Sequence, residues 1–303
     1  MVSVERVLEY GRIGCEADLT TRPSRAIDVG FNKEKWPQEG SVEYRSVSLV
    51  YPTVATPILS NITFKINGGE KVGVVGRTGA GKSSLITVLF RLAEPDGTIL
   101  VDGLDTKKIG LHEIRKKISI IPQDPTLFSG TIRRNLDPFN EFEDDALWRC
   151  LQDANLERVV HEMEGELDGA VTEGGSNLSV GQRQLLCLAR ALLKQNKVLV
   201  LDEATANVDH ETDKLIQATI KTKFESCTVI TVAHRLNTII DMDKVIFLDA
   251  GFLIEFDAPH TLLERKGQFF DMVEETGQHF SKMLHEMAKK AFYEKSHPKD
   301  YSD

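Results

Sequence analysis

A glycine-rich loop carries the clearest chemical pattern in this sequence of 303 residues. The loop is Gly76-Arg77-Thr78-Gly79-Ala80-Gly81-Lys82-Ser83. Its glycines allow successive backbone N–H groups to point at one anion, and a helix that begins there adds the positive end of its dipole. Lys82 would then reach the outer phosphates of a nucleotide, and the Ser83 hydroxyl would be offered to Mg²⁺. The run predicts a phosphate-binding loop, in which we include the next residue, Ser84.

Two carboxylates follow the apolar run Val198-Leu199-Val200-Leu201. Neighbouring side chains on a strand point to opposite faces, so Asp202 and Glu203 are expected to do different work. Asp202 suits Mg²⁺ through a water molecule, and Glu203 suits polarising the water that attacks a terminal phosphate. Strand ends are often acidic, so the pair is weak evidence by itself. Together with the glycine-rich loop it predicts nucleotide hydrolysis.

A second helix start resembles another anion site, about a hundred residues after the first. The run is Ser179-Val180-Gly181-Gln182-Arg183-Gln184, and an apolar stripe follows it. Ser179 and Gln182 fit a capping box, in which each side chain bonds to the backbone of the other residue. Gly181 costs stability inside a first helical turn. Its presence therefore suggests that another group approaches the backbone closely.

The elements that must position these residues follow from the apolar patterns. Alternation over 42–47 and 62–66 predicts antiparallel strands with one wet face. Continuous apolar runs alternate with helical patterns and predict a parallel sheet of the α/β class. These runs are 71–75, 198–201, 228–232 and 245–248.

Helical periodicity completes the expected organisation. A helix after the loop carries Leu85, Val88, Leu89 and Leu92, and a helical subdomain occupies about 124–193. Residues 1–40 read as a linker, 41–275 as the main domain and 276–303 as an amphipathic helix and tail. The apolar stripe of that last helix is Phe280, Met283, Leu284, Met287 and Ala291.

Composition excludes several classes of function. The net charge of −9 argues against nucleic acid as the main ligand and gives no reason to expect anionic lipid. The cysteines Cys15, Cys150, Cys187 and Cys227 form no CxxC pair, so neither zinc nor a disulfide framework is predicted. No apolar run approaches the roughly 18 residues that span a bilayer, and the first residues lack the pattern of a signal peptide. By itself the chain is expected to be cytosolic.

The run from Ser179 to Gln184 closely resembles the signature sequence of ATP-binding cassette proteins, and other family motifs fall in order between about Ser41 and Glu275. The resemblance implies a RecA-like P-loop NTPase fold with an antiparallel β subdomain and an inserted helical subdomain. It also implies that Tyr51 stacks on adenine, and that Gln123 contacts Mg²⁺ and couples to transmembrane domains. Asp209 is implied to lie in a loop across a dimer interface, and His234 to contact the γ-phosphate.

Cassettes of this family pair head to tail, which implies that Ser179, Val180, Gly181 and Gln182 face the ATP of a partner. Four runs resemble the second cassette of the multidrug-resistance-associated, or C, subfamily of exporters. They are residues 3–10, 76–81, 135–139 and 233–239. The implied activity is ATP hydrolysis that powers export of organic anions.

The implied partners are transmembrane domains and a first-half cassette of the same polypeptide, at the cytoplasmic face of a membrane. The sequence is then expected to be a fragment that is soluble by itself. Val180 stands where most members have glycine, and Ala206-Asn207-Val208 replaces the commoner Ser-Ala-Leu. Val180 adds bulk near a partner's nucleotide, so efficient pairing of two copies of this chain is an open question.

Rival classes lack their own motifs here. A genome-maintenance ATPase would separate the two motifs by long heptad repeats, and a GTPase would carry an Asn-Lys-x-Asp guanine reader. A ribosome-associated cassette factor would carry a second cassette in the same chain. A regulatory cassette that gates a channel, with little turnover, remains an alternative. The presence of Glu203 and His234 favours turnover.

Overall fold

The computed structural model describes residues 2–11, 16–52, 54, 56–204, 208–233 and 235–296. Alternating residues build an antiparallel sheet in the first third of the chain. Strand β1 (Val42–Leu49) pairs with β2 (Leu59–Ile66) and β4 (Asp96–Val101), and β5 (Leu104–Asp105) completes the order β2-β1-β4-β5. Val42, Tyr44 and Val47 are fully buried, and polar neighbours face outward, so the prediction of one wet face is confirmed.

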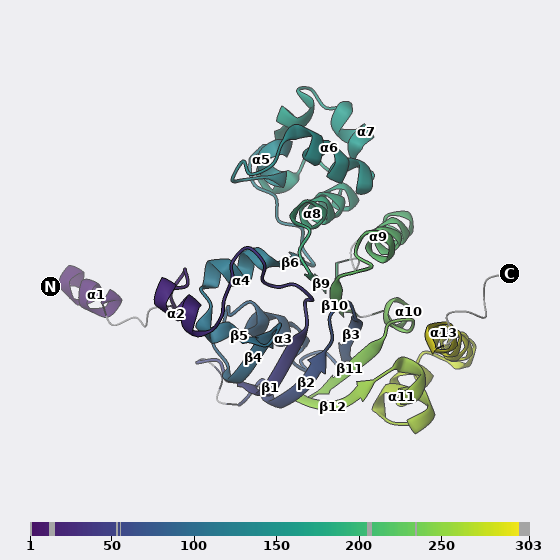
Figure 1. Ribbon diagram of the computed structural model, residues 1–303. Helices are drawn as coiled ribbons and strands as arrows, with labels where there is room; N and C mark the ends of the chain where they lie inside the picture. Colours follow the sequence, from purple (N-terminus) through teal and green to yellow (C-terminus); the bar gives the residue numbers. More distant parts are fainter. Residues whose placement is uncertain are drawn as a thin grey trace.

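The continuous apolar runs form a second sheet of six strands in the order β12-β11-β3-β10-β9-β6. The strands are β3 (Lys71–Gly76), β6 (Ile118–Ile121), β9 (Val198–Asp202), β10 (Thr228–Val232), β11 (Lys244–Asp249) and β12 (Phe252–Asp257). All neighbours are parallel except β11 and β12. The carboxyl ends of β3 and β9 therefore lie at the same edge of this sheet, as the two predicted chemical motifs require (Figure 1).

Helix α3 (Lys82–Leu89) packs between the two sheets, where Leu85, Val88 and Leu89 join one apolar core. The predicted helix was too long by one turn. Arg91 adopts a left-handed conformation (φ 49°), and Leu92 turns outward with 63% of its surface exposed. The Arg91 guanidinium donates to the carbonyl oxygens of Thr106 and Ile109, and this buried turn ends the helix where periodicity alone extended it.

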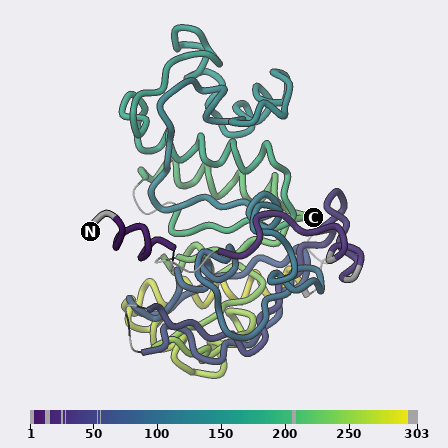
Figure 2. The backbone as a smooth tube through the Cα atoms, turned by 90° about the vertical axis from the view of Figure 1, so that its left-hand side faces the viewer, coloured from purple at the N-terminus to yellow at the C-terminus, as the bar shows by residue number. Residues whose placement is uncertain are grey.

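A mostly helical region lies above the parallel sheet in Figures 1 and 2. It contains α5 (Ile132–Leu136), α6 (Asp144–Asp153), α7 (Glu157–His161), α8 (Val180–Lys194) and the short strands β7 (Gly130–Thr131) and β8 (Ala170–Val171). Its apolar residues form one core with α9 (His210–Lys223) and with the facing side of the sheet. Cys150, Cys187 and Cys227 are free and buried, and all three belong to this apolar core.

Four helices from the last third of the chain cover the other end of the parallel sheet. They are α10 (Leu236–Ile239), α11 (Pro259–Arg265), α12 (Gln268–Glu274) and α13 (Gln278–Ser296). The structure has one helix, α13, after Gly277, and the apolar stripe predicted for it is partly wrong. Leu284 and Ala288 are buried against this third core, whereas Phe280 and Met283 are each 38% exposed, because α13 packs along α11 and α12 through a narrower face.

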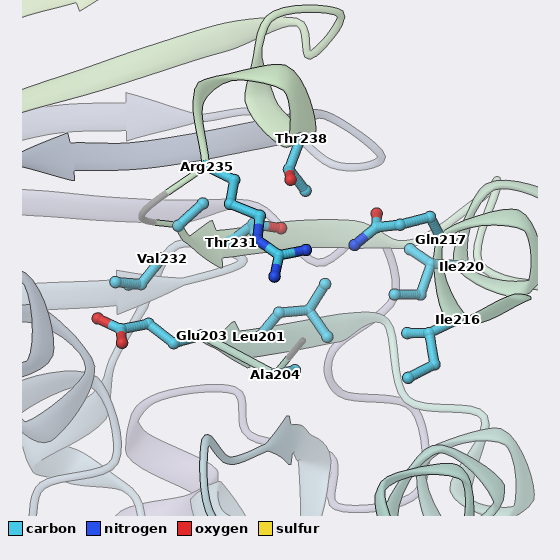
Figure 3. Close-up of a pocket in the computed structure, with 11 residues that line it drawn as sticks. Leu201, Glu203, Ala204, Ile216, Gln217, Ile220, Thr231, Val232, Arg235 and Thr238 are labelled. Atoms are coloured by element: carbon cyan, nitrogen blue, oxygen red, sulfur yellow. The ribbon is translucent and has the colours of Figure 1, made fainter. Parts of the chain in front are cut away.

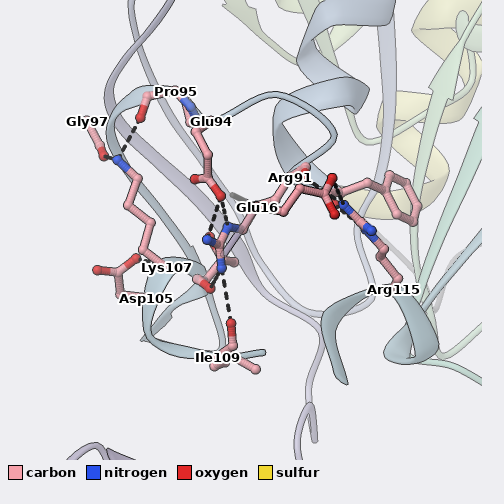
Figure 4. Close-up of polar contacts among 11 residues, drawn as sticks. Glu16, Arg91, Glu94, Pro95, Gly97, Asp105, Lys107, Ile109 and Arg115 are labelled. Atoms are coloured by element: carbon pink, nitrogen blue, oxygen red, sulfur yellow. Dashed lines mark hydrogen bonds and ion pairs between the residues drawn. The ribbon is translucent and has the colours of Figure 1, made fainter. Parts of the chain in front are cut away.

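The segment before β1 is anchored on the core by its backbone. After α1 (Val2–Tyr10) and before α2 (Pro23–Asp28), the carbonyl oxygens of Asp18 and Leu19 accept from the backbone of Leu111 and His112 at 3.1 and 2.9 Å. Those two residues open α4 (Leu111–Lys117), which faces the buried turn of Arg91. Figure 4 shows this surface, with Lys107 donating to the carbonyls of Pro95 and Gly97.

Single turns of 3₁₀ helix join several elements. They span Thr106–Lys108, Glu166–Asp168 and Glu173–Gly175. Within the described ranges, none of the helices combines the length and the apolar character that crossing a bilayer requires.

Candidate functional site

The glycine-rich loop connects β3 to α3 with its backbone exposed to an approaching anion. Gly76, Gly79 and Gly81 have positive φ values of 149°, 82° and 100°, which side chains rarely allow. A Cβ atom built on Gly81 would lie 2.9 Å from the Leu59 side chain, so the loop also needs glycine for packing. Gly81 is the N-cap of α3 and supplies no side-chain cap. The first N–H groups of α3 therefore meet the requirements of a phosphate site.

Lys82 lies folded over this loop. Its Nζ donates to the carbonyl oxygens of Gly76 and Arg77 at 2.9 and 3.3 Å, and the residue is only 6% exposed. Burial lowers the pKa of Lys82, while the nearby charges of Glu203 and Asp202 raise it. The Lys82 ammonium is therefore close enough to Asp202, the last residue of β9, and to Glu203, which follows it, for both charges to act on it. A charged lysine held among loop carbonyls can turn to phosphate oxygens, which are stronger acceptors.

Tyr51 lies beside the same loop. Its hydroxyl is 3.5 Å from the Ser84 Oγ, and its ring packs, half-buried, against the core that contains α3. The structure thus brings Tyr51, Lys82 and Ser84 together, although 31 residues separate the tyrosine from the lysine in the sequence. Ser83 follows Lys82 in the first turn of α3.

Glu203 follows the last residue of β9 in a left-handed conformation, with φ of 50°. Its backbone N–H donates to the Val232 carbonyl at 3.0 Å, which ties it to the end of β10. The Glu203 side chain borders a cavity of about 200 Å³ between the two strand ends and α9. Figure 3 shows Glu203 at one side of this cavity, Gln217, Ile216 and Ile220 at the other, and Arg235 extending between them.

The signature run forms the start of α8 as predicted. Ser179 Oγ accepts from the Gln182 N–H at 3.1 Å, and Gln182 Oε1 accepts from the Ser179 N–H at 2.8 Å, so the capping box is confirmed. Val180 is 38% exposed. A Cβ on Gly181 would lie 3.0 Å from Thr212 Oγ1 of α9. Within this chain, therefore, the group that approaches the Gly181 backbone is a threonine.

Asp209 is the N-cap of α9. Its carboxylate accepts from the N–H groups of Glu211 and Thr212 and from the Thr212 hydroxyl, the last at 2.7 Å. The hydrogen bonds from Thr212 lower the pKa of Asp209 below its usual value. Four residues later, Asp213 accepts from Arg235 at 2.9 Å and joins α9 to the segment after β10.

Sequence patterns did not reveal Thr212, Asp213 or Arg235 as neighbours of the site. Their only signal was proximity in sequence to Asp209 and His234. Gln123 is exposed just after β6, and the Gln184 side chain donates to the neighbouring Pro122 carbonyl at 3.0 Å. His234 and Ala206-Asn207 lie outside the described residues.

The donor set at the loop fits Mg²⁺. A serine hydroxyl and a carboxylate are hard oxygen ligands, and Mg²⁺ in nucleotide sites takes few protein ligands because phosphates and waters complete its shell. Ser83 directly follows Lys82 in the first turn of α3, and the Asp202 carboxylate lies near enough to raise the pKa of the Lys82 ammonium. In the described ranges, no cluster of three or more His, Cys, Asp or Glu side chains could hold a metal ion.

Comparison with known proteins agrees with this geometry. Residues 59–206 match the ABC transporter family model. A solved structure, "Structure of a bacterial Atm1-family ABC exporter with ATP bound", superposes with a TM-score of 0.74 at 32% identity, over 80% of this chain and 43% of that one. The fold and the site define an ABC transporter ATPase domain, and the predicted fold class is confirmed.

Two curated relatives narrow the class. Human ATP-binding cassette sub-family C member 4 is 50% identical over 98% of this chain and 22% of its own length. The probable multidrug resistance-associated protein lethal(2)03659 of Drosophila melanogaster is 49% identical over 96% and 21%. The chain belongs with the ATP-binding cassettes of the multidrug-resistance-associated C sub-family, and its predicted resemblance to multidrug resistance-associated protein 4 is confirmed. It spans about a fifth of the length of these relatives.

Proposed function

We propose that this cassette binds Mg-ATP, pairs head to tail with a second cassette and, by hydrolysing ATP, powers export of organic anions through transmembrane domains. The observation that carries the proposal is that the glycine-rich loop after β3 and the two acids at the end of β9 lie at the same carboxyl edge of the parallel sheet, close enough for both carboxylates to raise the pKa of Lys82. Phosphoryl chemistry needs positioning and charge stabilisation more than covalent help, and this edge supplies both signs of charge.

In this proposal the first turn of α3 and Lys82 hold the β- and γ-phosphates, and Tyr51 supports the adenine ring. Ser83, Asp202 and Gln123 hold Mg²⁺, which neutralises phosphate charge when it is bound. Glu203 accepts a proton from the attacking water, and His234 orients the γ-phosphate. The left-handed backbone of Glu203 and its bond to Val232 support this role, because they fix where the carboxylate begins.

The signature residues act on the other nucleotide of the pair. Ser179, Val180, Gly181 and Gln182 would cap the ATP of the partner, and Asp209 would lie at the interface. Closure of the pair would move the transmembrane domains through the exposed Gln123 region, at the cytoplasmic face of the membrane. The C-sub-family relatives support the assignment to an exporter, since this chain shares about half of its residues with them.

Turnover by a Glu203→Gln variant tests the catalytic role. We expect ATP binding to persist and turnover per molecule to fall at least about 100-fold, the usual contribution of a general base. Turnover should be measured over a range of protein concentrations, because the site needs a partner. Glu286→Gln, at an exposed position on α13, is the control for charge. If Glu203→Gln turns over ATP like the control, the catalytic role of Glu203 is wrong.

A further inference from the structure

A cavity at the amino edge of the parallel sheet, opposite the edge that carries the nucleotide site, is lined by several positively charged side chains. It lies where α6, α8 and α9 meet the starts of β9 and β10, and its volume is about 560 Å³. Ligand pockets in proteins commonly measure 300–1,000 Å³, so this cavity has room for a small organic molecule. Four cationic side chains line it, Arg149, Lys194, Lys197 and Lys223, against one carboxylate, Asp153.

The cations exceed what the protein itself can neutralise. Asp153 already pairs with Lys223 at 2.7 Å. Over the described part of the chain, no carboxylate lies within ion-pair distance of the Lys194 or Lys197 ammonium. The pKa of Lys194 is lowered, first by partial burial and then by the nearby charges of Arg190 and Lys116, which outweigh the opposing effect of Glu141. The Glu141 carboxylate is paired with Lys116. A local excess of positive charge is unexpected in a chain of net charge −9.

Helix dipoles explain only part of this arrangement. Lys194 and Lys223 stand in the last turns of α8 and α9, where cations stabilise the negative end of a helix. Arg149 lies in α6 before its last turn begins, and Lys197 lies in the connection before β9. Neither of these two residues serves the C-terminus of α8 or α9. Their convergence on the same cavity therefore needs a further reason.

Apolar side chains form another part of the lining, beside the polar residues Gln195 and Ser226. Phe142 and Leu192 from the helical region and Phe224 from the end of α9 face the same space. Such a surface matches a ring or a short alkyl group, whereas the ammonium groups match a carboxylate, sulfonate or phosphate. We propose that this cavity is a binding site for an amphipathic organic anion, separate from the nucleotide site.

The cavity lies at the joint between the helical region and the parallel sheet, so a bound anion would affect how these two regions move. Lys194 is the last residue of α8, and Lys197 is the last residue of the three-residue connection to β9, in which buried Asn196 donates to the Lys116 carbonyl at 2.9 Å. Helix α8 carries the signature run at its other end, and β9 carries Asp202 at its other end. An anion bridging these lysines links the helical region to the sheet at their joint. It would restrain the one region relative to the other.

Binding of 8-anilinonaphthalene-1-sulfonate, a fluorescent amphipathic anion, tests the site. Titrations are made with saturating Mg-ADP, so that the probe does not report the glycine-rich loop. The double variant Lys194→Gln/Lys197→Gln is compared with Lys65→Gln/Lys289→Gln, which removes the same charge from exposed positions on β2 and α13. We expect the first pair to weaken binding about five- to tenfold, as loss of two partly exposed ionic contacts predicts, and the second to leave it unchanged.

Two further measurements guard the interpretation. The neutral analogue N-phenyl-1-naphthylamine should bind more weakly than the sulfonate and should be insensitive to both double variants. Hydrogen exchange should slow on probe binding within α6 and around residues 194–197. The proposal is overturned if the two double variants bind the sulfonate equally well, or if the neutral analogue binds as tightly. Because Mg-ADP binding is followed separately, loss of the nucleotide site would be recognised as a different failure.

Discussion

Gly181 satisfies two requirements at the scale of a single residue. Its Cα faces α9 so closely that an added Cβ would lie 3.0 Å from Thr212 Oγ1 and 3.2 Å from Thr212 Cγ2. Thr212 cannot easily turn away, because its hydroxyl donates to Asp209 at 2.7 Å. Packing inside this chain therefore explains the glycine without any ligand. The same small residue keeps the start of α8 narrow for the partner's ATP in the proposed pair.

A double-mutant cycle on the contact between Gly181 and Thr212 should give a coupling free energy of predictable sign. Gly181→Ala should change the free energy of unfolding by less than about 0.5 kcal/mol, because a helix gain of up to about 1 kcal/mol is offset by the threonine contact. In a Thr212→Ala background the same substitution should stabilise the protein by about 0.5–1 kcal/mol. Urea unfolding measures both steps.

The control for this cycle is Thr222→Ala, near the other end of α9, where the hydroxyl bonds only to helix carbonyls. Gly181→Ala should add to it without coupling. Additive free energies in the Thr212 cycle would mean that α8 and α9 relax apart, and the packing explanation of Gly181 would be wrong.

At the scale of elements, Asp102 joins the segment before β1 to the turn between β4 and β5. Its Oδ2 accepts from the N–H groups of Gln38 and Glu39 at 2.6 and 3.0 Å, and its Oδ1 accepts from the Ser41 N–H at 2.7 Å. Burial opposes the charged form of Asp102, but the backbone donors outweigh it and lower its pKa below 3.8. The carboxylate thus substitutes for missing strand partners of this segment.

Asp102→Asn should lower the free energy of unfolding by roughly 2 kcal/mol at pH 7, because a charged acceptor of several hydrogen bonds becomes a neutral one. The depressed pKa means that this stability is present above the unfolded value and is lost as pH falls through the folded one. The difference in the free energy of unfolding between wild type and variant should therefore become smaller as pH drops below about 4. Urea unfolding at several pH values, with exposed Asp96→Asn as the control, measures it. If this difference in unfolding free energy stays constant with pH, the role of the negative charge on Asp102 is wrong.

Sequence patterns predicted an element well when the interactions that define it join residues only a few positions apart. The capping box of Ser179 and Gln182 and the buried alternation of Val42, Tyr44 and Val47 are of this kind. The end of α3 was missed, because it depends on Arg91 reaching carbonyls 15 and 18 residues away. The anchoring by Asp102 spans more than 60 residues and leaves no periodic signal.

Site residues followed the same rule. The glycine-rich loop and the acids after β9 are contiguous runs whose chemistry can be read directly. The pairing of Gly181 with Thr212, and of Asp213 with Arg235, depends on how α8, α9 and the end of β10 pack. Hydrophobic periodicity defines which face of a helix is buried but does not define which residue it meets there.

At the scale of the whole molecule, the two anion-seeking helix starts belong to different regions. The loop before α3 lies in the sheet core, and the capping box of α8 opens the helix that leads from the helical region back to β9. In the proposed head-to-tail pair each ATP is held by the loop of one chain and the signature of the other. On this proposal neither start completes a site inside one molecule, so activity is expected to depend on pairing.

Complementation between two inactive variants distinguishes this shared site from a site within one chain. Lys82→Ala removes the phosphate lysine, and Ser179→Arg blocks the signature, so each variant alone should show almost no turnover at high protein concentration. An equal mixture should recover about a quarter of wild-type turnover, since half of the random pairs are mixed and each keeps one intact site of two. A site built within one chain would recover nothing in the mixture. That result would remove the head-to-tail assignment of Ser179 while leaving the roles of Lys82 and Glu203 standing.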